Sequence, residues 1–206
     1  MNTNPRLSRS ARWLAGALCV ASLTACAPLM VGGALTGAMV AVDRRSSGAQ
    51  LDDEGIELRA SNRLRDEMGN RARVSVTSYN HRVLLTGEAA NQAAKAEVEA
   101  VLKSMDNVGV IYNELAITNS PSFGDKANDS LLTGRVKAGL VEIKEISTNS
   151  FKVVSERGTV YLMGRVTQRE SDMATEVART TKGAERVVRV MEILTPEELA
   201  RLPSLK

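Results

Sequence analysis

Val83-Leu84-Leu85-Thr86-Gly87 and Val160-Tyr161-Leu162-Met163-Gly164 are two apolar runs, each closed by a glycine, that lie 77 positions apart. Upstream of each run, apolar residues recur at every fourth position, as they do on one face of a helix. These residues are Ile56, Ala60 and Leu64 before the first run, and Leu132, Val136 and Leu140 before the second. The helical stretches are 76 positions apart, so the second copy carries one extra residue between helix and strand. Matching patterns in the same order predict a duplicated module.

Each copy predicts the same order of elements. Asp52-Asp53 and Asn128-Asp129 predict the N-caps of the two first helices. Alternating apolar residues near 74–78 and 153–155 predict half-buried strands. Each strand turns back at once into a glycine-ended run, which predicts an antiparallel hairpin. A second helix and a last strand follow, at 91–105 and 108–117 in the first copy, and at 168–181 and 187–194 in the second. The predicted fold class is α+β, with modules of the order α-β-β-α-β: a three-stranded sheet covered on one face by two helices.

The N-terminus has the three parts of a secretory signal. A basic region carries Arg6, Arg9 and Arg12, and an apolar core follows that is too short to span a membrane. Leu23-Thr24-Ala25-Cys26 then resembles a bacterial lipobox, in which the cysteine is acylated and the preceding residues are removed. The alternative is a buried first helix of a cytosolic protein. With three acyl chains on Cys26, membrane anchoring would be stable. Ala27 resembles the residue found after the cysteine in lipoproteins that are sorted to the outer membrane, since Asp at that place usually retains a lipoprotein in the inner membrane.

The predicted organisation has six parts. They are a signal peptide (1–25), a lipidated tether (26–50), a first module (51–118), a linker (119–127), a second module (128–194) and a tail (195–206) that opens with a short helix at Pro196. Within the tether, residues 27–42 are apolar and rich in glycine, and a second spanning helix is the rival interpretation there. Residues 43–48 are predicted to be a polar hinge.

Charge and cysteine content exclude several classes of function. The chain has 27 basic and 24 acidic residues, and removal of the three signal arginines leaves 24 of each. A neutral mature chain gives no support to nucleic-acid binding. Cys19 leaves with the signal and Cys26 is lipidated, so no disulfide is expected, and His81 is the only histidine, so no metal centre and no cofactor are expected.

The module pattern resembles a known family. The order α-β-β-α-β, the strands that end at Gly87 and Gly164, and the Val-rich last strand resemble the BON domain. Two such modules behind a lipobox resemble the dual BON-domain outer-membrane lipoproteins, over residues 50–194. The resemblance implies attachment to phospholipid membranes, a role in envelope integrity and in envelope stress, and no enzymatic activity. It also implies that anionic lipid contacts the first helix of the second module, often through a bulky aromatic, where this chain has Leu131.

The candidate lipid-binding residues are Leu131, Arg135 and Lys137. Leu131 lies about 100° around the helix from the core-facing stripe of Leu132 and its successors, and Arg135 follows one turn later on the same side. A leucine beside cations suits contact with anionic headgroups. The alternative is that Leu131 packs against the first module or the linker. Net charge agrees with a lipid role, because residues 51–118 carry −3 and residues 119–206 carry +2.

Other residues are predicted to be structural. Gly87 and Gly164 are expected to meet a backbone constraint or a close approach rather than a ligand. His81 lacks a nucleophile or a paired carboxylate, so a surface turn is expected and no catalytic residue is predicted. Asp52, Asp53 and Glu54 are interpreted as helix caps rather than a cation site. The sequence therefore predicts a lipid-anchored protein on the periplasmic face of the outer membrane that binds anionic phospholipid. The alternative is a scaffold that docks onto an envelope protein through a sheet edge or helix face.

Overall fold

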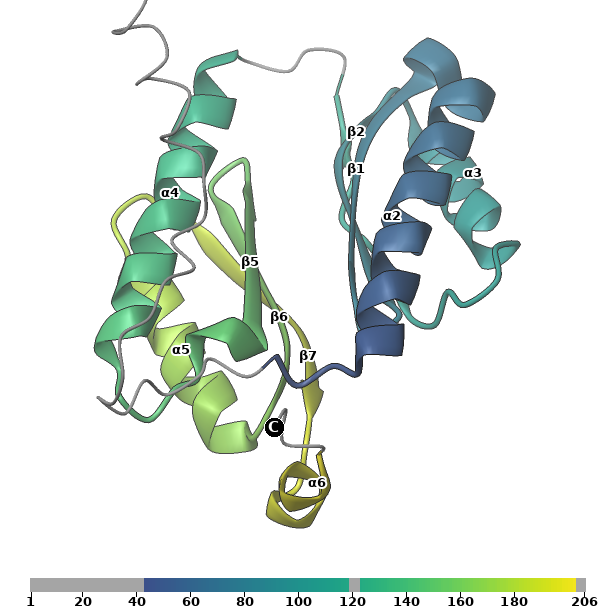
Figure 1. Cartoon of the computed structure of the whole chain (residues 1–206). Coiled ribbons are helices and arrows are strands. Elements are labelled where there is room, and N and C mark those ends of the chain that lie inside the picture. Colours follow the sequence, from purple (N-terminus) through teal and green to yellow (C-terminus); the bar gives the residue numbers. More distant parts are fainter. Residues whose placement is uncertain (1–42, 119–122, 203–206) are drawn as a thin grey trace, which may run out of the picture. The chain divides into compact units, whose positions relative to one another are not determined.

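The first module places two helices on one face of a sheet. The computed structural model describes residues 43–118 and 123–202 (Figure 1). Helix α2 (Ser47–Met68) and the short 3₁₀ turn η2 (Gly69–Arg71) lead into strands β1 (Ala72–Tyr79) and β2 (Arg82–Ala89). Helix α3 (Gln92–Lys103) and the short strands β3 (Ile111–Asn113) and β4 (Ala116–Ile117) complete the module. Both helices bury apolar residues against the same face of this sheet, which confirms the predicted layers.

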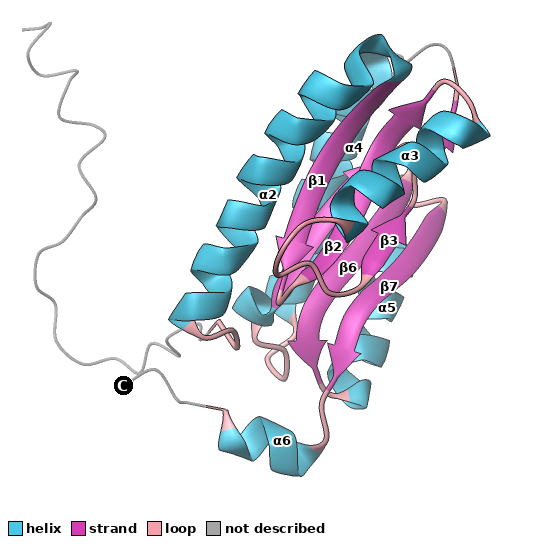
Figure 2. Cartoon of the chain, turned by 90° about the vertical axis from the view of Figure 1, so that its right-hand side faces the viewer, coloured by secondary structure: helices cyan, strands magenta, loops and turns pink. Residues whose placement is uncertain are grey.

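The second module repeats this order. It consists of α4 (Phe123–Glu142), η3 (Thr148–Ser150), β5 (Phe151–Glu156), β6 (Thr159–Val166), α5 (Gln168–Thr180) and β7 (Arg186–Ile193). Figure 2 shows helices and strands in separate colours. A last helix, α6 (Pro196–Arg201), begins with Pro196 behind a Thr195 capping box, as the tail sequence predicts. No helix in the described part of the chain is both long enough and apolar enough to cross a membrane.

The strands pair as predicted in both hairpins. β1 and β2 are antiparallel from Ala72↔Ala89 to Tyr79↔Arg82, which leaves a two-residue turn at Asn80-His81. β5 and β6 close in the same way around Arg157-Gly158. All four turn residues have positive φ, which matches the right-handed twist of the strands. The last strand of each module lies parallel to the middle strand, so both sheets are mixed.

The predicted last strand of the first module is interrupted. Ile111–Asn113 and Ala116–Ile117 both pair with β2, and between them the Glu114 amide still donates to the Leu85 carbonyl of β2 at 3.0 Å. The Lys95 ammonium donates to the Leu115 carbonyl at 2.7 Å, and the Leu115 side chain is buried in the core. A side-chain contact from α3 therefore holds Leu115 at the point where the strand is interrupted.

Among residues 43–118 and 123–202, three apolar clusters stabilise the fold. Ile56, Ala60, Leu64 and Met68 of α2 are buried with residues of β2 and α3. The second module has a matching core that contains Leu132, Val136 and Leu140. A third cluster joins residues on the opposite sheet faces of both modules: Tyr79, Leu84, Tyr161, Met163 and Val190. The two modules therefore pack together through their sheets, as expected for two small units that would each bury little surface alone.

Both first helices begin earlier than predicted. Ser46 caps α2, because its hydroxyl accepts from the Ala49 amide at 3.1 Å. α4 begins at Phe123, so five residues of the predicted linker are helical. The N-cap role predicted for Asp52-Asp53 and Asn128-Asp129 is therefore wrong, since these residues lie inside the helices.

Candidate functional site

Helix α4 has an exposed apolar face. Leu131 is 57% exposed and Val141 is 67% exposed, although Leu132, Val136 and Leu140 of the same helix are buried. Gly134 and Ala138 are also exposed and lie between Leu131 and Val141. The spacing of these four residues (i, i+3, i+7, i+10) places them on one side of the helix, over about 15 Å of its length. We call Leu131, Gly134, Ala138 and Val141 the α4 apolar face.

Cations border this face. Arg135 lies about 40° from Leu131 around the helix and Lys137 lies about 120° away, and both side chains are exposed. Arg135 donates to the Lys182 carbonyl at 3.3 Å, which brings the loop after α5 beside α4. Within residues 43–118 and 123–202, none of Arg135, Lys137 and Lys182 forms an ion pair with an acid. The structure thus brings Leu131 and Arg135 together and leaves Lys137 on the flank.

A polar cleft of about 480 Å³ adjoins the α4 apolar face. Its walls come from the first half of α4, the β5–β6 turn and the loop after α5. Arg135, Lys182 and Arg157 bring positive charge to it, and Asp129 and Glu185 bring negative charge. The Asp129 carboxylate is already engaged by the turn, because it accepts from the backbone amides of Arg157 at 2.7 Å and Gly158 at 3.0 Å.

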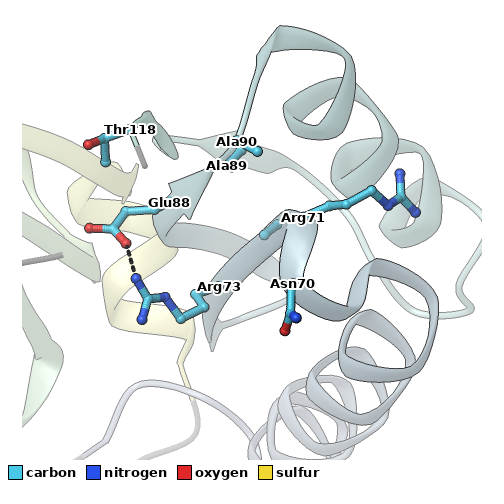
Figure 3. A pocket seen from close by; sticks show the side chains of 8 residues that line it. Asn70, Arg71, Arg73, Glu88, Ala89, Ala90 and Thr118 are labelled. Carbon is cyan, nitrogen blue, oxygen red and sulfur yellow. Dashed lines mark hydrogen bonds and ion pairs between the residues drawn. The ribbon is translucent and has the colours of Figure 1, made fainter. Parts of the chain in front are cut away.

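A second cleft, in the first module, differs in its charges. It measures about 280 Å³ and includes Arg71, Arg73 and Glu88 in its lining (Figure 3). The Arg73 guanidinium donates to Glu88 at 2.9 Å, and Arg71 pairs with Glu97. Both arginines of this cleft therefore already have acidic partners, unlike Arg135 and Lys182 beside α4.

Asp53 anchors the first hairpin turn. Its buried carboxylate accepts from the Ser78 hydroxyl at 2.6 Å and from the backbone amides of Asn80 at 2.7 Å and His81 at 2.9 Å. Burial opposes ionisation, but these hydrogen bonds and one from Arg45 outweigh it and lower the pKa of Asp53. The two aspartates at matching positions of the repeat, Asp53 and Asp129, thus hold the hairpins of their own modules.

Gly87 and Gly164 lie where a side chain would meet backbone. A Cβ at Gly87 would come closer than 3.0 Å to the Arg73 carbonyl oxygen in the neighbouring strand, and Gly87 has a φ of +111°. A Cβ at Gly164 would overlap the Ser150 carbonyl oxygen in the same way. Neither glycine lines the cleft beside α4.

The remaining candidates from the sequence are His81, a possible metal site and Cys26. His81 occupies its predicted turn, where its Nδ1 lies 2.8 Å from the Asn107 carbonyl. In the described ranges no three side chains of the metal-binding types come together as a metal site. Cys26 lies outside the described residues.

Val141 and Lys182 are site residues that the sequence reasoning missed. Val141 could have been found, because its spacing of ten residues from Leu131 places both on the same exposed side of the helix. Lys182 could not, because it is 51 positions from Leu131 and only the packing of the loop after α5 beside α4 brings it near.

Comparison with known proteins identifies the modules. Residues 52–119 and 128–195 each match the family model described as "BON domain". The chain is 35% identical over 174 residues to "Outer membrane lipoprotein DolP" of Haemophilus influenzae, which covers 84% of this chain and 90% of the relative. It is 34% identical over 152 residues to a "21 kDa hemolysin" of Actinobacillus pleuropneumoniae, which covers 73% of this chain and 78% of that one.

Likeness to solved structures is weaker. The C-terminal domain of CdsD, a structural protein of the type III secretion system of Chlamydia trachomatis, aligns with 15% identity and a TM-score of 0.28. That alignment covers 69% of this chain and 67% of the solved chain, and its TM-score is too low to show a shared fold. The two BON matches and the extended identity to a full-length relative are decisive, and this chain belongs to the dual BON-domain outer-membrane lipoproteins.

Proposed function

We propose that this protein binds anionic phospholipid through the α4 apolar face of its second module and thereby supports the integrity of the outer membrane. The observation that carries the proposal is that Leu131, more than half exposed, lies beside Arg135, with Lys182 in the adjoining cleft, and that neither cation has an acidic partner in the described part of the chain. A leucine can enter the boundary between headgroups and acyl chains while the cations contact phosphate. The net charge of each module agrees, because only the second one is positive.

We propose that the protein is not an enzyme. The buried carboxylates of Asp53 and Asp129 are occupied by hairpin turns. The turn histidine, His81, lies against the Asn107 carbonyl and, contrary to expectation, 3.7 Å from the exposed Asp52 carboxylate. Binding rather than catalysis is the role that exposed apolar and basic side chains suit.

Sedimentation with liposomes tests the lipid proposal. The mature chain carrying Cys26→Ser removes the acyl anchor, and vesicles of phosphatidylcholine with or without phosphatidylglycerol vary the anionic lipid. Leu131→Glu should lower binding to the anionic vesicles by at least about tenfold, since it removes an apolar anchor of roughly 1.5–3 kcal/mol. Added salt should weaken binding of the parent, because exposed charges are screened.

Leu58→Glu is the matched control. Leu58 is 65% exposed on α2, the corresponding helix of the first module. This variant should bind vesicles like the parent. Equal losses in both variants would mean that any added acid repels the protein from the vesicle. Unchanged binding by a folded Leu131→Glu protein would place the lipid contact elsewhere.

A protein-interaction scaffold is the second candidate function. β7 is an eight-residue strand at the edge of its sheet and pairs only with β6 among the described strands. Such an edge can accept a strand from another protein. Cross-linking in intact envelopes tests this candidate, which predicts adducts that form through β7 and do not depend on Leu131.

A further inference from the structure

The segment just before α2 binds both modules through two consecutive arginines. Arg44 reaches the second module, where its guanidinium makes two hydrogen bonds to Glu170, at 2.8 and 2.7 Å, and one to the Arg165 carbonyl at 2.9 Å. Arg165 in turn donates to the Arg44 carbonyl at 3.2 Å. Side chain and backbone of Arg44 are thus both held by residues more than 120 positions away.

Arg45 binds the first module instead. It donates to the buried Asp53 carboxylate at 2.9 Å and to Asp43 at 2.7 Å. Its guanidinium carbon also lies 4.3 Å from the centre of the Tyr79 ring, a cation–π arrangement. Tyr79 belongs to the apolar cluster between the two sheets, so Arg45 packs on a member of that cluster.

We propose that Arg44 and Arg45 form a clamp that holds the two BON modules in one arrangement. The clamp also attaches to both modules the segment from which the chain continues toward its N-terminus. The sequence predicts a polar hinge at these residues. The structure shows instead a segment held by ion pairs on two sides.

Burial separates the Arg44–Glu170 pair from the other ion pairs between the modules. The side chains of Arg44 and Glu170 are only 12% and 10% exposed. The Lys152–Glu57 and Arg186–Glu114 pairs also join the modules, but their basic partners are 38% and 57% exposed. Exposed pairs are screened by water and salt and contribute little, whereas removal of one partner from a buried pair leaves an uncompensated charge.

Glu170 also caps helix α5 of its own module. Its carboxylate also accepts from the Thr167 amide at 2.8 Å and so completes the capping box of α5. Burial opposes ionisation here, but Arg44 and Thr167 outweigh it and lower the pKa of Glu170. The capping box remains within the second module when Arg44 is lost, so loss of docking can be distinguished from unfolding.

A zero-length cross-link between native residues measures docking. The Lys152 ammonium lies 2.6 Å from the Glu57 carboxylate of the other module, so a carbodiimide should join them, and peptide mass spectrometry would detect the product. The test uses the mature chain with Cys26→Ser across a urea series, with far-ultraviolet circular dichroism recorded in parallel. In the parent, the cross-link and the dichroism should be lost together.

Arg44→Gln should lose the cross-link at lower urea, in a range where dichroism still reports folded modules. We expect its docking constant to fall at least about tenfold, which corresponds to about 1.4 kcal/mol. Arg44→Lys should fall between the two, because an ammonium cannot replace the two-pronged guanidinium contact.

Arg71→Gln is the control, because Arg71 also forms a two-pronged pair with Glu97, but on the surface of the first module alone. In this variant the cross-link and the dichroism should be lost at the same urea concentration, as in the parent. The proposal is overturned if Arg44→Gln keeps the parent's cross-linking curve. It is equally overturned if cross-link and dichroism shift together, because Arg44 would then stabilise one module rather than join two.

Discussion

At the scale of single residues, Gly87 and Gly164 are constrained by the carbonyl groups of the residues that precede their strand partners, Val74 and Phe151. A methyl group at either position would displace the Arg73 or Ser150 carbonyl, and at Gly87 it would also require a φ that side chains rarely adopt. Both constraints act on backbone, which cannot move aside as a flexible side chain can. These positions therefore tolerate no other residue without a shift of the strand.

We predict that Gly87→Ala and Gly164→Ala each lower the free energy of unfolding by more than about 1 kcal/mol. Thermal melts should show losses of roughly 2–4 °C per kcal/mol for a chain of this size. Gly134→Ala is the control, since it sits inside a helix and no neighbouring atom lies within 4 Å of the place that its added methyl group would take. That variant should be as stable as the parent or slightly more stable. Parental melting of both strand variants would contradict the structural role.

At the scale of elements, a helix and a hairpin are joined by one carboxylate in each module. Asp53 accepts from two turn amides, a hydroxyl and Arg45, whereas Asp129 accepts from two turn amides. Hydrogen bonds to an ionised group contribute more than those between neutral groups. The turn residues, with their positive φ, are thus held by the helix that packs on their strands.

We predict that Asp53→Asn lowers the free energy of unfolding by about 1.5–3 kcal/mol, because an amide puts donors where the turn amides need acceptors. Asp129→Asn should cost less, since it has fewer partners. Urea denaturation would measure both. Asp52→Asn is the neighbouring control, and its half-exposed carboxyl should matter little. A loss at Asp52 equal to that at Asp53 would refute the anchoring role.

At the scale of the whole molecule, carboxylates hold the modules to each other and to the preceding segment. The pKa values of Asp53 and Glu170 are lowered, against the opposing effect of burial, by hydrogen bonds from neighbouring donors. A lowered folded-state pKa contributes stability that is complete above the unfolded-state value of roughly 4 and is lost as pH falls through the folded-state value.

We therefore predict that the protein is stable at neutral pH and loses stability progressively below about pH 4. Urea midpoints measured from pH 7 to pH 2 would show this fall. In Arg44→Gln the fall should be shallower, because Glu170 has lost the partner that makes its ionisation favourable. An equally steep fall in that variant would mean that Glu170 does not contribute to the loss of stability in acid.

Glu156 should act in the opposite direction. Burial, together with the charges of Asp129 and Glu88, raises its pKa, so the ionised form destabilises the folded protein at neutral pH. Glu156→Gln should raise the urea midpoint at pH 7, and the gain should vanish once pH falls below the unfolded-state pKa of roughly 4.3. A gain that stays constant with pH would have another cause.

Anchoring is a property of the whole chain. We predict that Cys26→Ser leaves the two modules folded but releases the protein from the membrane, because the cores at 43–202 are complete without acyl chains. Fractionation of the envelope would show the variant in the soluble periplasmic fraction. Retention in the outer membrane at the parental level would contradict lipidation at Cys26.

The candidate site could be predicted only in part. The exposure of Leu131 and its neighbour Arg135 follows from helical periodicity, since core residues at 132, 136 and 140 leave position 131 on another side. Lys182 and the cleft beside α4 depend on a loop from the other end of the module. Their proximity comes from packing, which periodicity does not describe.

Local sequence patterns were enough to predict the order of elements, the two hairpins and the buried stripes of the helices, because each depends on residues a few positions apart. The order of elements in turn carried the resemblance to the family. The roles of Asp53 and Asp129, which the same patterns assigned to helix caps, became visible only in the folded chain. Within the hinge predicted at 43–48, folding holds Arg44 against its partner Glu170, which is 126 positions away. Contacts of that range depend on how the two modules pack, and no local pattern in the chain records them.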